Sequence, residues 1–251
     1  MPLSFSIITC TWNSARYLEE SMRSVLAQDY PALEYIFVDG GSTDGTLDQI
    51  HALRRPYHLI ENIRGGISNA MNAGIRAARG DVIAHLHSDD YYLAPDVLST
   101  VARHLAPRTA HWLFGRTKRD IGGVLLPESF VAPRYSYTRL LRGNFIPHPA
   151  TFVRRHLMQS AGGFDTRLTY AMDYDLWLRL GRVSQPLQLD QAFAAFREHD
   201  GSLSTHFRTA AMEEDFHVRM AYAGNDPLAR IMHTARHYVR RHRARRAASG
   251  K

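Results

Sequence analysis

Short apolar runs alternate with segments of helical spacing in the first part of the chain, and this alternation sets the strongest limit on its fold. The apolar runs predict strands over 4–10, 35–38, 58–60 and 82–86. The spacing of apolar residues predicts helices over 14–27, 46–53 and 67–78. Strands separated by such helices form βαβ units, whose strands lie parallel in one sheet. We therefore expect an α/β fold with a Rossmann-like, mostly parallel central sheet flanked by helices.

Three of the expected strands end in small polar or acidic residues, in segments 11–13, 39–45 and 88–90. Ligands of open α/β sheets bind at the carboxyl ends of the strands, near the point where the strand order reverses. These segments are therefore the first candidates for a binding site. They contain neither the GxGxxG dinucleotide fingerprint nor the GxxxxGK[ST] phosphate loop, which argues against a dehydrogenase or an NTPase.

The second half of the chain is less regular. Strands are expected over 112–115, 123–126 and 187–196, and a proline-flanked loop runs into a strand within 144–154. Helical spacing appears over 173–180, 212–223 and 228–239. We expect one domain over 1–205, followed by a C-terminal helical basic extension over 206–251.

Composition excludes several classes of protein. The 251 residues are 45% hydrophobic, which is enough to form a sizeable core. Cys10 is the one cysteine, so a disulfide-rich secreted scaffold is excluded. No apolar run reaches the roughly 18 residues of a membrane span, and segment 1–10 resembles a first strand more than a signal peptide. These features predict a cytoplasmic protein.

The net charge of +7 comes from the C-terminal end, because 227–251 holds eight basic and no acidic residues. The rest of the chain carries a net charge of −1, so the charge is not on a working surface and no nucleic-acid partner is expected. The segment 228–246 combines these arginines with a stripe of Leu228, Ile231, Ala235, Tyr238 and Val239. Such a helix can lie on an anionic membrane surface, here the inner face of the plasma membrane, as a peripheral contact. The alternative is a helix packed on the domain with a solvated basic tail.

Asp89 and Asp90 form the sharpest chemical feature of the chain. Two adjacent carboxylates repel one another, and a divalent cation between them removes that cost. Mn²⁺ or Mg²⁺ prefers oxygen ligands of this kind, often completed by substrate phosphates. The alternative interpretation is a helix N-cap.

Asp39 and Trp12 each allow a functional and a structural interpretation. The carboxylate of Asp39, at a strand tip, can accept hydrogen bonds from a base edge or a ribose hydroxyl, or it can belong to a capped turn in which Ser42 or Thr43 starts the next helix. The ring of Trp12 can stack on a nucleobase, or it can be an ordinary core aromatic.

Asp173 and Asp175 stand two residues apart at the start of an expected helix, so they do not share a face. One of them can point into a cleft as a general base while the other caps the helix or stays in solvent. The alternative is a pair of acidic residues favoured by the helix dipole. His148, His199 and His206 lie in polar, turn-rich settings, which are also typical of ordinary surface histidines.

A set of motifs follows one another along the chain in a fixed order: SIITCTWN, VDGGSTDGT, GGISNAMNAGIRAARGD, HSDD, NFIPHPATFVRR, GGFD, MDYDLWLRL and REHDGSLS. This ordered set resembles glycosyltransferase family 2, the inverting enzymes of GT-A fold, and in particular stand-alone bacterial enzymes that build exopolysaccharide and lipopolysaccharide. The resemblance covers roughly residues 4–205.

The resemblance implies a nucleotide-binding half over 1–110 and an acceptor-binding half over 111–205. The donor would be a UDP-, GDP- or dTDP-sugar, and the acceptor a glycan or a lipid-linked oligosaccharide. Asp173 matches the catalytic base, and Asp90, with Asp89 and His199, matches the metal site, Asp90 being the stronger candidate for the direct ligand. The nucleotide-sugar site would comprise Thr11, Trp12, Asp39, Ser68, Asn69, Asn72 and Asp89.

The chain departs from the family pattern at several positions. Met172 stands where relatives usually have a glutamate, which removes a carboxylate that would raise the pKa of the base. Asn69 replaces a frequent aspartate, and 62–65 lacks the usual Asp and Pro. The QxxRW motif of processive synthases is absent, so transfer of one sugar per encounter is expected.

Two other functions are alternatives to a glycosyltransferase. One is a sugar-nucleotide nucleotidyltransferase, which would need a basic glycine-rich loop near the first strand. The other is a non-catalytic nucleotide-binding scaffold on the same fold.

Overall fold

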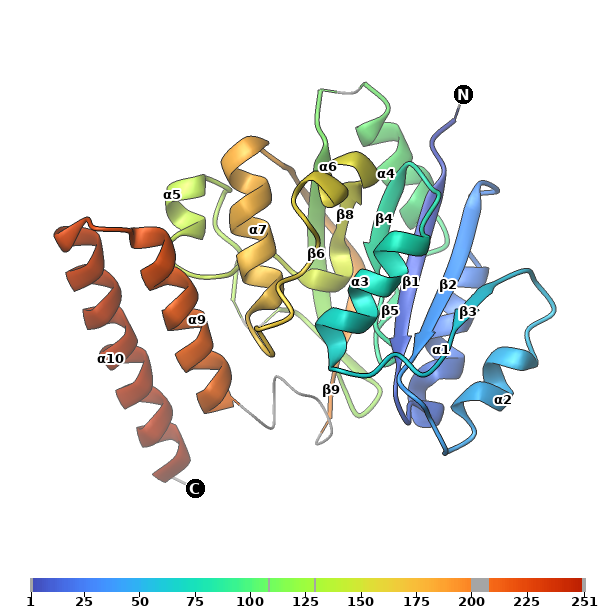
Figure 1. Ribbon diagram of the computed structural model, residues 1–251, viewed down its shortest axis with the longest axis horizontal. Helices are drawn as coiled ribbons and strands as arrows, with labels where there is room; N and C mark the ends of the chain where they lie inside the picture. Colours follow the sequence, from blue (N-terminus) through green and yellow to red (C-terminus); the bar gives the residue numbers. More distant parts are fainter. Residues whose placement is uncertain (1, 108, 129, 200–207, 250–251) are drawn as a thin grey trace.

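The computed structural model describes residues 2–107, 109–128, 130–199 and 208–249, with the side chains of 209–242 in the C-terminal part. His206, the boundary expected at 205/206, and the side chains of Arg243, Arg245, Arg246 and Lys251 lie outside the described residues. The α/β fold expected from the sequence is confirmed, with helices on both sides of one sheet (Figure 1).

The sheet has the strand order β3-β2-β1-β4-β8-β6-β9-β5, and β7 pairs with β6. The strands are β1 (Phe5–Thr11), β2 (Leu33–Asp39), β3 (His58–Ile60), β4 (Val82–His85), β5 (Tyr91–Tyr92), β6 (Trp112–Ile121), β7 (Val124–Leu126), β8 (Thr151–Arg154) and β9 (Leu187–Glu198). The helices are α1 (Ala15–Leu26), α2 (Thr46–His51), α3 (Ile67–Ala77), α4 (Val97–Leu105), α5 (Tyr137–Leu140), the 3-10 turn η1 (His148–Ala150), α6 (Arg155–Ser160), α7 (Met172–Val183), α9 (Arg208–Ala223) and α10 (Pro227–Ser249).

The N-terminal half of the sheet is parallel, and the other half is mixed. Strand β1 pairs in parallel with β2 on one side and β4 on the other, so the strand order reverses at β1. Strand β8 runs antiparallel to both β4 and β6. A parallel return needs a long crossover, usually a helix, whereas the described chain between β7 and β8 holds only the four-residue helix α5 and the short turn η1.

Strand β1 shows why both faces of the sheet are covered. All seven of its residues are buried. Ile8 and Cys10 pack on the face of α3, α6 and α7, while Phe5 and Ile7 pack on the face of α1 and α4 (Figure 1). Alternate side chains of a strand point to opposite faces, so a strand between two helical layers is apolar throughout.

Gly74 lets α3 lie close to this strand. A Cβ atom at position 74 would stand 2.5 Å from Cγ2 of Ile8, a β-branched side chain with little freedom to move. The close approach brings the start of α3 to the edge where β1 and β2 end.

The C-terminal helices form an antiparallel pair beside α7, with α9 between α7 and α10 (Figure 1). The inner side of α10 carries His233 and His237, which are buried. Ion pairs between arginines of α10 and acidic residues of α9 join the helices, among them Arg240 with Asp215 at 3.3 Å and Arg241 with Glu213 at 3.0 Å. The basic segment is therefore packed on the domain, and part of its charge is neutralised by α9. In the described part of the chain, no helix is long and apolar enough to cross a membrane.

Three histidines lie together beside the end of β4, of which His85 is buried and His87 and His148 are partly buried. The ring of His148 contacts His85 and His87, with centroids 5.7 Å and 4.9 Å apart, and stacks on Phe164. Burial, reinforced by His87, lowers the pKa of His85 to about 3. Burial also lowers the pKa of His148 well below its usual range. These side chains are neutral in the folded protein at neutral pH.

This cluster predicts a loss of stability in mild acid. Unfolded His85 takes up a proton near pH 6.5, whereas folded His85 does so only near pH 3. The contribution of His85 to the free energy of unfolding is therefore complete above pH 6.5 and declines as the pH falls. The free energy of unfolding is lower by about 2 kcal/mol at pH 5. Urea unfolding at pH 7 and pH 5 should show a smaller pH-dependent loss for His85→Gln than for the unsubstituted protein. The exposed His58 serves as a control, since His58→Gln should keep the full loss. An equal loss of stability between pH 7 and pH 5 in all three proteins would show that His85 does not cause it.

Candidate active site

The polar segments expected at the strand ends do meet at one edge of the sheet. Strands β1 and β2 end in register at Thr11 and Asp39, and β4 lies beside β1. The start of α7 lies at the same, lower edge in Figure 1. The candidate site residues therefore come from both halves of the chain.

Asp39 is fully buried and organises the loop that follows β2. Its Oδ1 accepts hydrogen bonds from the backbone N–H groups of Gly41 and Ser42, at 2.7 and 2.8 Å. Its Oδ2 accepts from the hydroxyls of Thr11 and Ser42, at 2.7 and 2.6 Å. Burial raises the pKa of Asp39, but the donors at Ser42, Thr11 and Gly41 outweigh it and leave the pKa below its usual range. The structure thus gives Thr11 and Asp39 a clear role in holding the loop.

Trp12 is the exposed member of this group, with 68% of its surface accessible. Asn13 adopts a positive φ of 49°, and its side chain accepts a hydrogen bond from the Thr43 N–H at 2.9 Å. Asp44 accepts hydrogen bonds from the Thr46 N–H and hydroxyl at the start of α2. The loops after β1 and β2 hold each other, and the indole lies on their surface.

The three polar side chains expected near the ribose and diphosphate all make intramolecular bonds. Ser68 donates to the Leu168 carbonyl at 3.1 Å, and Asn69 donates to the Gly65 carbonyl at 2.8 Å. Asn72 donates to the Phe164 carbonyl and accepts from the Phe164 N–H, both at 2.8 Å. Ser68 and Asn72 therefore tie α3 to the segment that leads into α7. Their contact with a nucleotide sugar stays a prediction.

Asp89 and Asp90 differ sharply in their surroundings. Asp90 is 1% exposed, and its Oδ1 accepts a hydrogen bond from the backbone N–H of Arg197 at 3.1 Å. Burial, together with the charge of Asp89, raises the pKa of Asp90 well above its usual range. The Asp89 side chain is 28% exposed, and its Oδ2 lies 3.0 Å from Nε2 of His199. The resemblance favours Asp90 as the direct metal ligand, which stays a prediction; in the structure Asp89 is the more accessible of the two and lies beside His199.

A divalent cation fits this pair only as part of a shared site. Within the described ranges, no cluster of three or more His, Cys, Asp or Glu side chains could hold a metal by itself. Mg²⁺ and Mn²⁺ are commonly bound through one or two carboxylates and completed by water and substrate phosphates. Asp89 and His199 would therefore hold such an ion together with a bound diphosphate.

Arg197, which sequence reasoning missed, fixes the end of β9 at this edge. Its guanidinium pairs with Glu20 on α1 and with Asp120 on β6. It also lies over the rings of Tyr17 and Tyr91, 4.6 and 5.1 Å from their centroids. Since His199 follows two residues later, these contacts hold the segment that brings its imidazole to Asp89.

Asp173 lines a pocket of about 250 Å³ at the start of α7. Its Oδ1 accepts from the Tyr174 N–H at 2.6 Å, and its Oδ2 from Nδ2 of Asn144 at 3.1 Å. Burial, reinforced by the charge of Asp215 and opposed by the donors at Tyr174 and Asn144, raises the pKa of Asp173 to about 7. Such a carboxyl exchanges protons near neutral pH, as a general base requires.

Asp175 does not share this pocket, as the two-residue spacing predicts. It forms an ion pair with Arg179 one turn further along α7, at 2.7 Å. It also accepts a hydrogen bond from the Tyr222 hydroxyl on α9, at 3.0 Å. Asp175 therefore joins α7 to α9.

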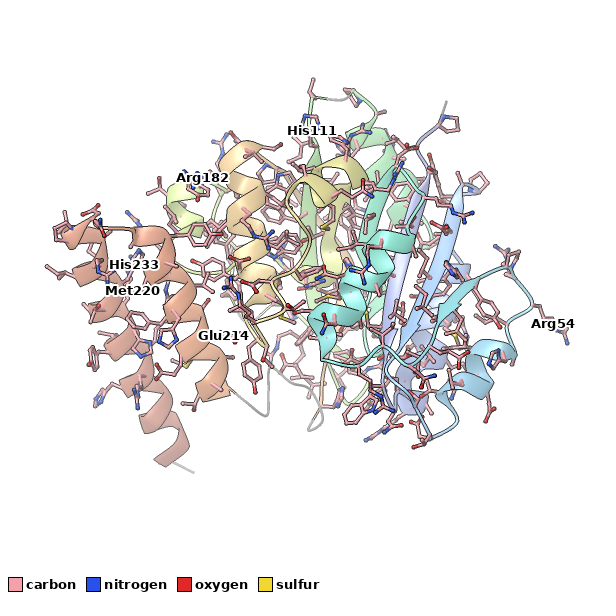
Figure 2. All side chains as sticks on the ribbon, in the orientation of Figure 1. Arg54, His111, Arg182, Glu214, Met220 and His233 are labelled. Carbon is pink, nitrogen blue, oxygen red and sulfur yellow. The ribbon has the colours of Figure 1, made fainter. Side chains whose placement is uncertain are left out.

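Glu214 on α9, also missed by sequence reasoning, fixes the segment that leads into α7. Its carboxylate accepts hydrogen bonds from the backbone N–H groups of Thr169, Tyr170 and Ala171, at 3.0, 2.5 and 2.6 Å. Figure 2 shows Glu214 between α9 and this segment. The next residue, Asp215, lines the same pocket as Asp173. No local pattern in the sequence indicates these contacts, because they join positions more than 40 residues apart.

Comparison with known proteins gives the family. The model of glycosyl transferase family 2 matches residues 6–157. A protein named an uncharacterized glycosyltransferase, from Mycobacterium tuberculosis (strain CDC 1551 / Oshkosh), is 31% identical over 191 residues, which cover 73% of this chain and 71% of the relative. Chondroitin synthase of Pasteurella multocida (strain Pm70) is 31% identical over 188 residues, 72% of this chain but 19% of the relative.

Solved structures support the fold. Residues 1–349 of S. aureus TarS in complex with UDP-GlcNAc align with a TM-score of 0.72 and 22% identity, over 88% of this chain and 67% of that one. The mannosyltransferase PcManGT from Pyrobaculum calidifontis, in complex with GDP-Man and Mn²⁺, aligns with a TM-score of 0.66 and 20% identity, over 94% and 74%.

The fold and the family match together define an α/β transferase of GT-A fold. The chain belongs to glycosyltransferase family 2. The enzyme class predicted from the sequence is confirmed, and the alternative of a sugar-nucleotide nucleotidyltransferase finds no support.

Proposed function

We propose that this glycosyltransferase moves one sugar from a nucleotide-sugar donor to a hydroxyl of a glycan or lipid-linked acceptor. The transfer inverts the configuration at the anomeric carbon and serves the synthesis of a bacterial surface polysaccharide. The observation that carries the proposal is Asp173, a carboxylate held by Asn144 in a pocket of suitable size for part of a sugar. Its pKa of about 7 suits proton transfer at neutral pH.

The reaction needs one displacement. The carboxylate of Asp173 takes the proton of the acceptor hydroxyl while that oxygen bonds to the anomeric carbon. The bond from this carbon to the diphosphate oxygen breaks, and the leaving nucleoside diphosphate keeps the electron pair. Attack from the face opposite the leaving group inverts the configuration. The Asn144 amide and the Tyr174 N–H orient the carboxylate, one on each oxygen.

The edge beside β1 and β2 is the proposed donor site. The exposed indole of Trp12 offers a stacking surface for a base, above a loop that Asp39 holds rigid. TarS and PcManGT, which share the fold, have structures with UDP-GlcNAc and GDP-Man. When bound at Asp89 and His199, Mn²⁺ or Mg²⁺ would neutralise charge on the leaving diphosphate.

Calorimetric titration with UDP, GDP, dTDP and CMP, each with and without Mn²⁺, tests the donor site. We expect one nucleotide to bind, at least about tenfold more tightly with Mn²⁺, and we expect Asp89→Asn to lose that enhancement. Asp48→Asn, on the exposed side of α2, is the matched control and should behave like the unsubstituted protein. Binding that ignores Mn²⁺ would remove the metal from the proposal.

Replacement of Asp173 tests the base. With the nucleotide sugar selected by that titration, Asp173→Asn should lower kcat by about 10²–10⁴ while the donor Kd changes less than about twofold. Because the base must be unprotonated, the rate of the unsubstituted enzyme should rise with pH through about 7. Asp175→Asn, which removes the neighbouring carboxylate that pairs with Arg179, should keep most of kcat. Full turnover by Asp173→Asn would refute the assignment.

We also propose that α10 contacts anionic lipid as a peripheral membrane helix. Its outer side presents one continuous apolar stripe, while the opposite side packs on α9. The sequence of α10 contains no acidic residue, so the stripe has positively charged flanks. The most exposed members of the stripe are Leu228, Ile231, Met232, Tyr238 and Val239.

Vesicle flotation tests this contact. The protein should float with vesicles of phosphatidylglycerol and phosphatidylcholine and much less with phosphatidylcholine alone. The double substitution Ile231→Glu with Val239→Glu should abolish flotation. Val183→Glu is the control, because Val183 is 72% exposed on α7. Absence of flotation, with concentration-dependent dimerisation in ultracentrifugation, would instead assign the stripe to a second copy of the chain.

A further inference from the structure

The pocket of Asp173 contains a second carboxylate, supplied by the C-terminal helix pair. Asp215 on α9 lines this pocket with Asp173, Asn144 and Tyr170, and its side chain is 18% exposed. No basic side chain is among the described residues that line the pocket. Its wall is therefore acidic and rich in hydrogen-bond acceptors.

Two arginines form ion pairs with Asp215. Its Oδ2 lies 3.2 Å from Nη1 of Arg219 and 3.3 Å from Nη1 of Arg240. Arg219 is only 1% exposed, so this ion pair is largely removed from water. Both guanidinium groups also lie next to Gly143, where a Cβ atom would stand 3.8 and 3.6 Å from them. Their positive charges partly offset the charge of Asp215, but neither arginine is among the described residues that line the pocket.

The backbone of α9 fixes where this carboxylate stands. Glu214, its neighbour in sequence, binds three backbone N–H groups directly before α7 (Figure 2). Asp173 is the second residue of α7. Glu214 thus holds the part of α9 that carries Asp215 against the segment that leads to Asp173. Burial raises the pKa of Asp215, while Arg219 and Arg240 lower it.

We propose that Asp215 binds the acceptor sugar by accepting a hydrogen bond from one of its hydroxyls, and that the pocket takes an uncharged sugar. This inference rests on the proposed function, in which Asp173 is the base. A sugar hydroxyl is a donor that a carboxylate binds strongly, and charge-assisted hydrogen bonds fix its orientation. A uronate or a phosphate in the same place would face two carboxylates, while Arg219 and Arg240 already pair with Asp215 and do not line the pocket, which is unfavourable.

Acceptor kinetics test the assignment. The acceptors are p-nitrophenyl hexosides and N-acetylhexosaminides, with the matching p-nitrophenyl glucuronide as the acidic counterpart. We expect the unsubstituted enzyme to prefer the neutral acceptors. Asp215→Asn should raise the KM of the neutral acceptors by about 10–100-fold and should leave the donor KM and the rate of donor hydrolysis within about twofold. It should also reduce the preference of the enzyme for neutral acceptors over the glucuronide. Asp215→Glu should restore part of the acceptor affinity.

Two further variants separate a role in the pocket from a structural role. Glu213→Gln removes the adjacent α9 carboxylate, which pairs with Arg241 outside the pocket, and should leave the acceptor KM unchanged. Met212→Lys adds a cation to the pocket wall and should raise use of the glucuronide relative to the neutral acceptors.

An unchanged acceptor KM and an unchanged preference in Asp215→Asn would overturn the inference, as would an equal rise in donor KM. Full transfer by Asp173→Asn would overturn the proposed function instead. The two failures are therefore distinguishable.

Discussion

The candidate acceptor site depends on one carboxylate, that of Glu214. A helix begins with backbone N–H groups that have no partner inside the helix, and the segment before α7 adds more. Glu214 accepts from three of these groups in a row, which holds the start of α7 against α9. Asp173 stands just after this junction, and Asp215 stands next to Glu214 on α9. A single interaction thus sets the position of both carboxylates in the pocket.

The acidic residues at the site edge divide into two kinds by their surroundings. Asp39 and Asp90 are buried and bind backbone N–H groups, so they build loops and strand ends. Asp89, Asp173 and Asp215 keep part of their surface accessible and face open space or a pocket. A buried carboxylate is stable only when its hydrogen bonds replace those of water, which explains why Asp39 accepts four hydrogen bonds.

A comparison of expectation with structure shows where local pattern suffices. The helices and strands of the N-terminal half lie close to the expected ranges, because their apolar spacing is dictated by burial on a parallel sheet. The sequence analysis did not predict helix α4 or the antiparallel direction of β8. The direction of β8 depends on the short connection that precedes it and not on the periodicity of its own residues. Met172 leaves Asp173 without a carboxylate directly before it, yet the charge of Asp215 on another helix also raises the pKa of Asp173.

The sequence by itself determined the family, the parallel half of the sheet, and the acidic residues available for chemistry, because motifs and periodicity are properties of neighbouring positions. Only the tertiary structure decided which of those residues are accessible: Asp89 with His199 rather than Asp90, and Asp173 with Asp215. The tertiary structure also decided that Arg240 and Arg241 form ion pairs with acidic residues of α9. Burial, pairing and pKa depend on groups brought together from distant parts of the chain, and no local pattern encodes that proximity.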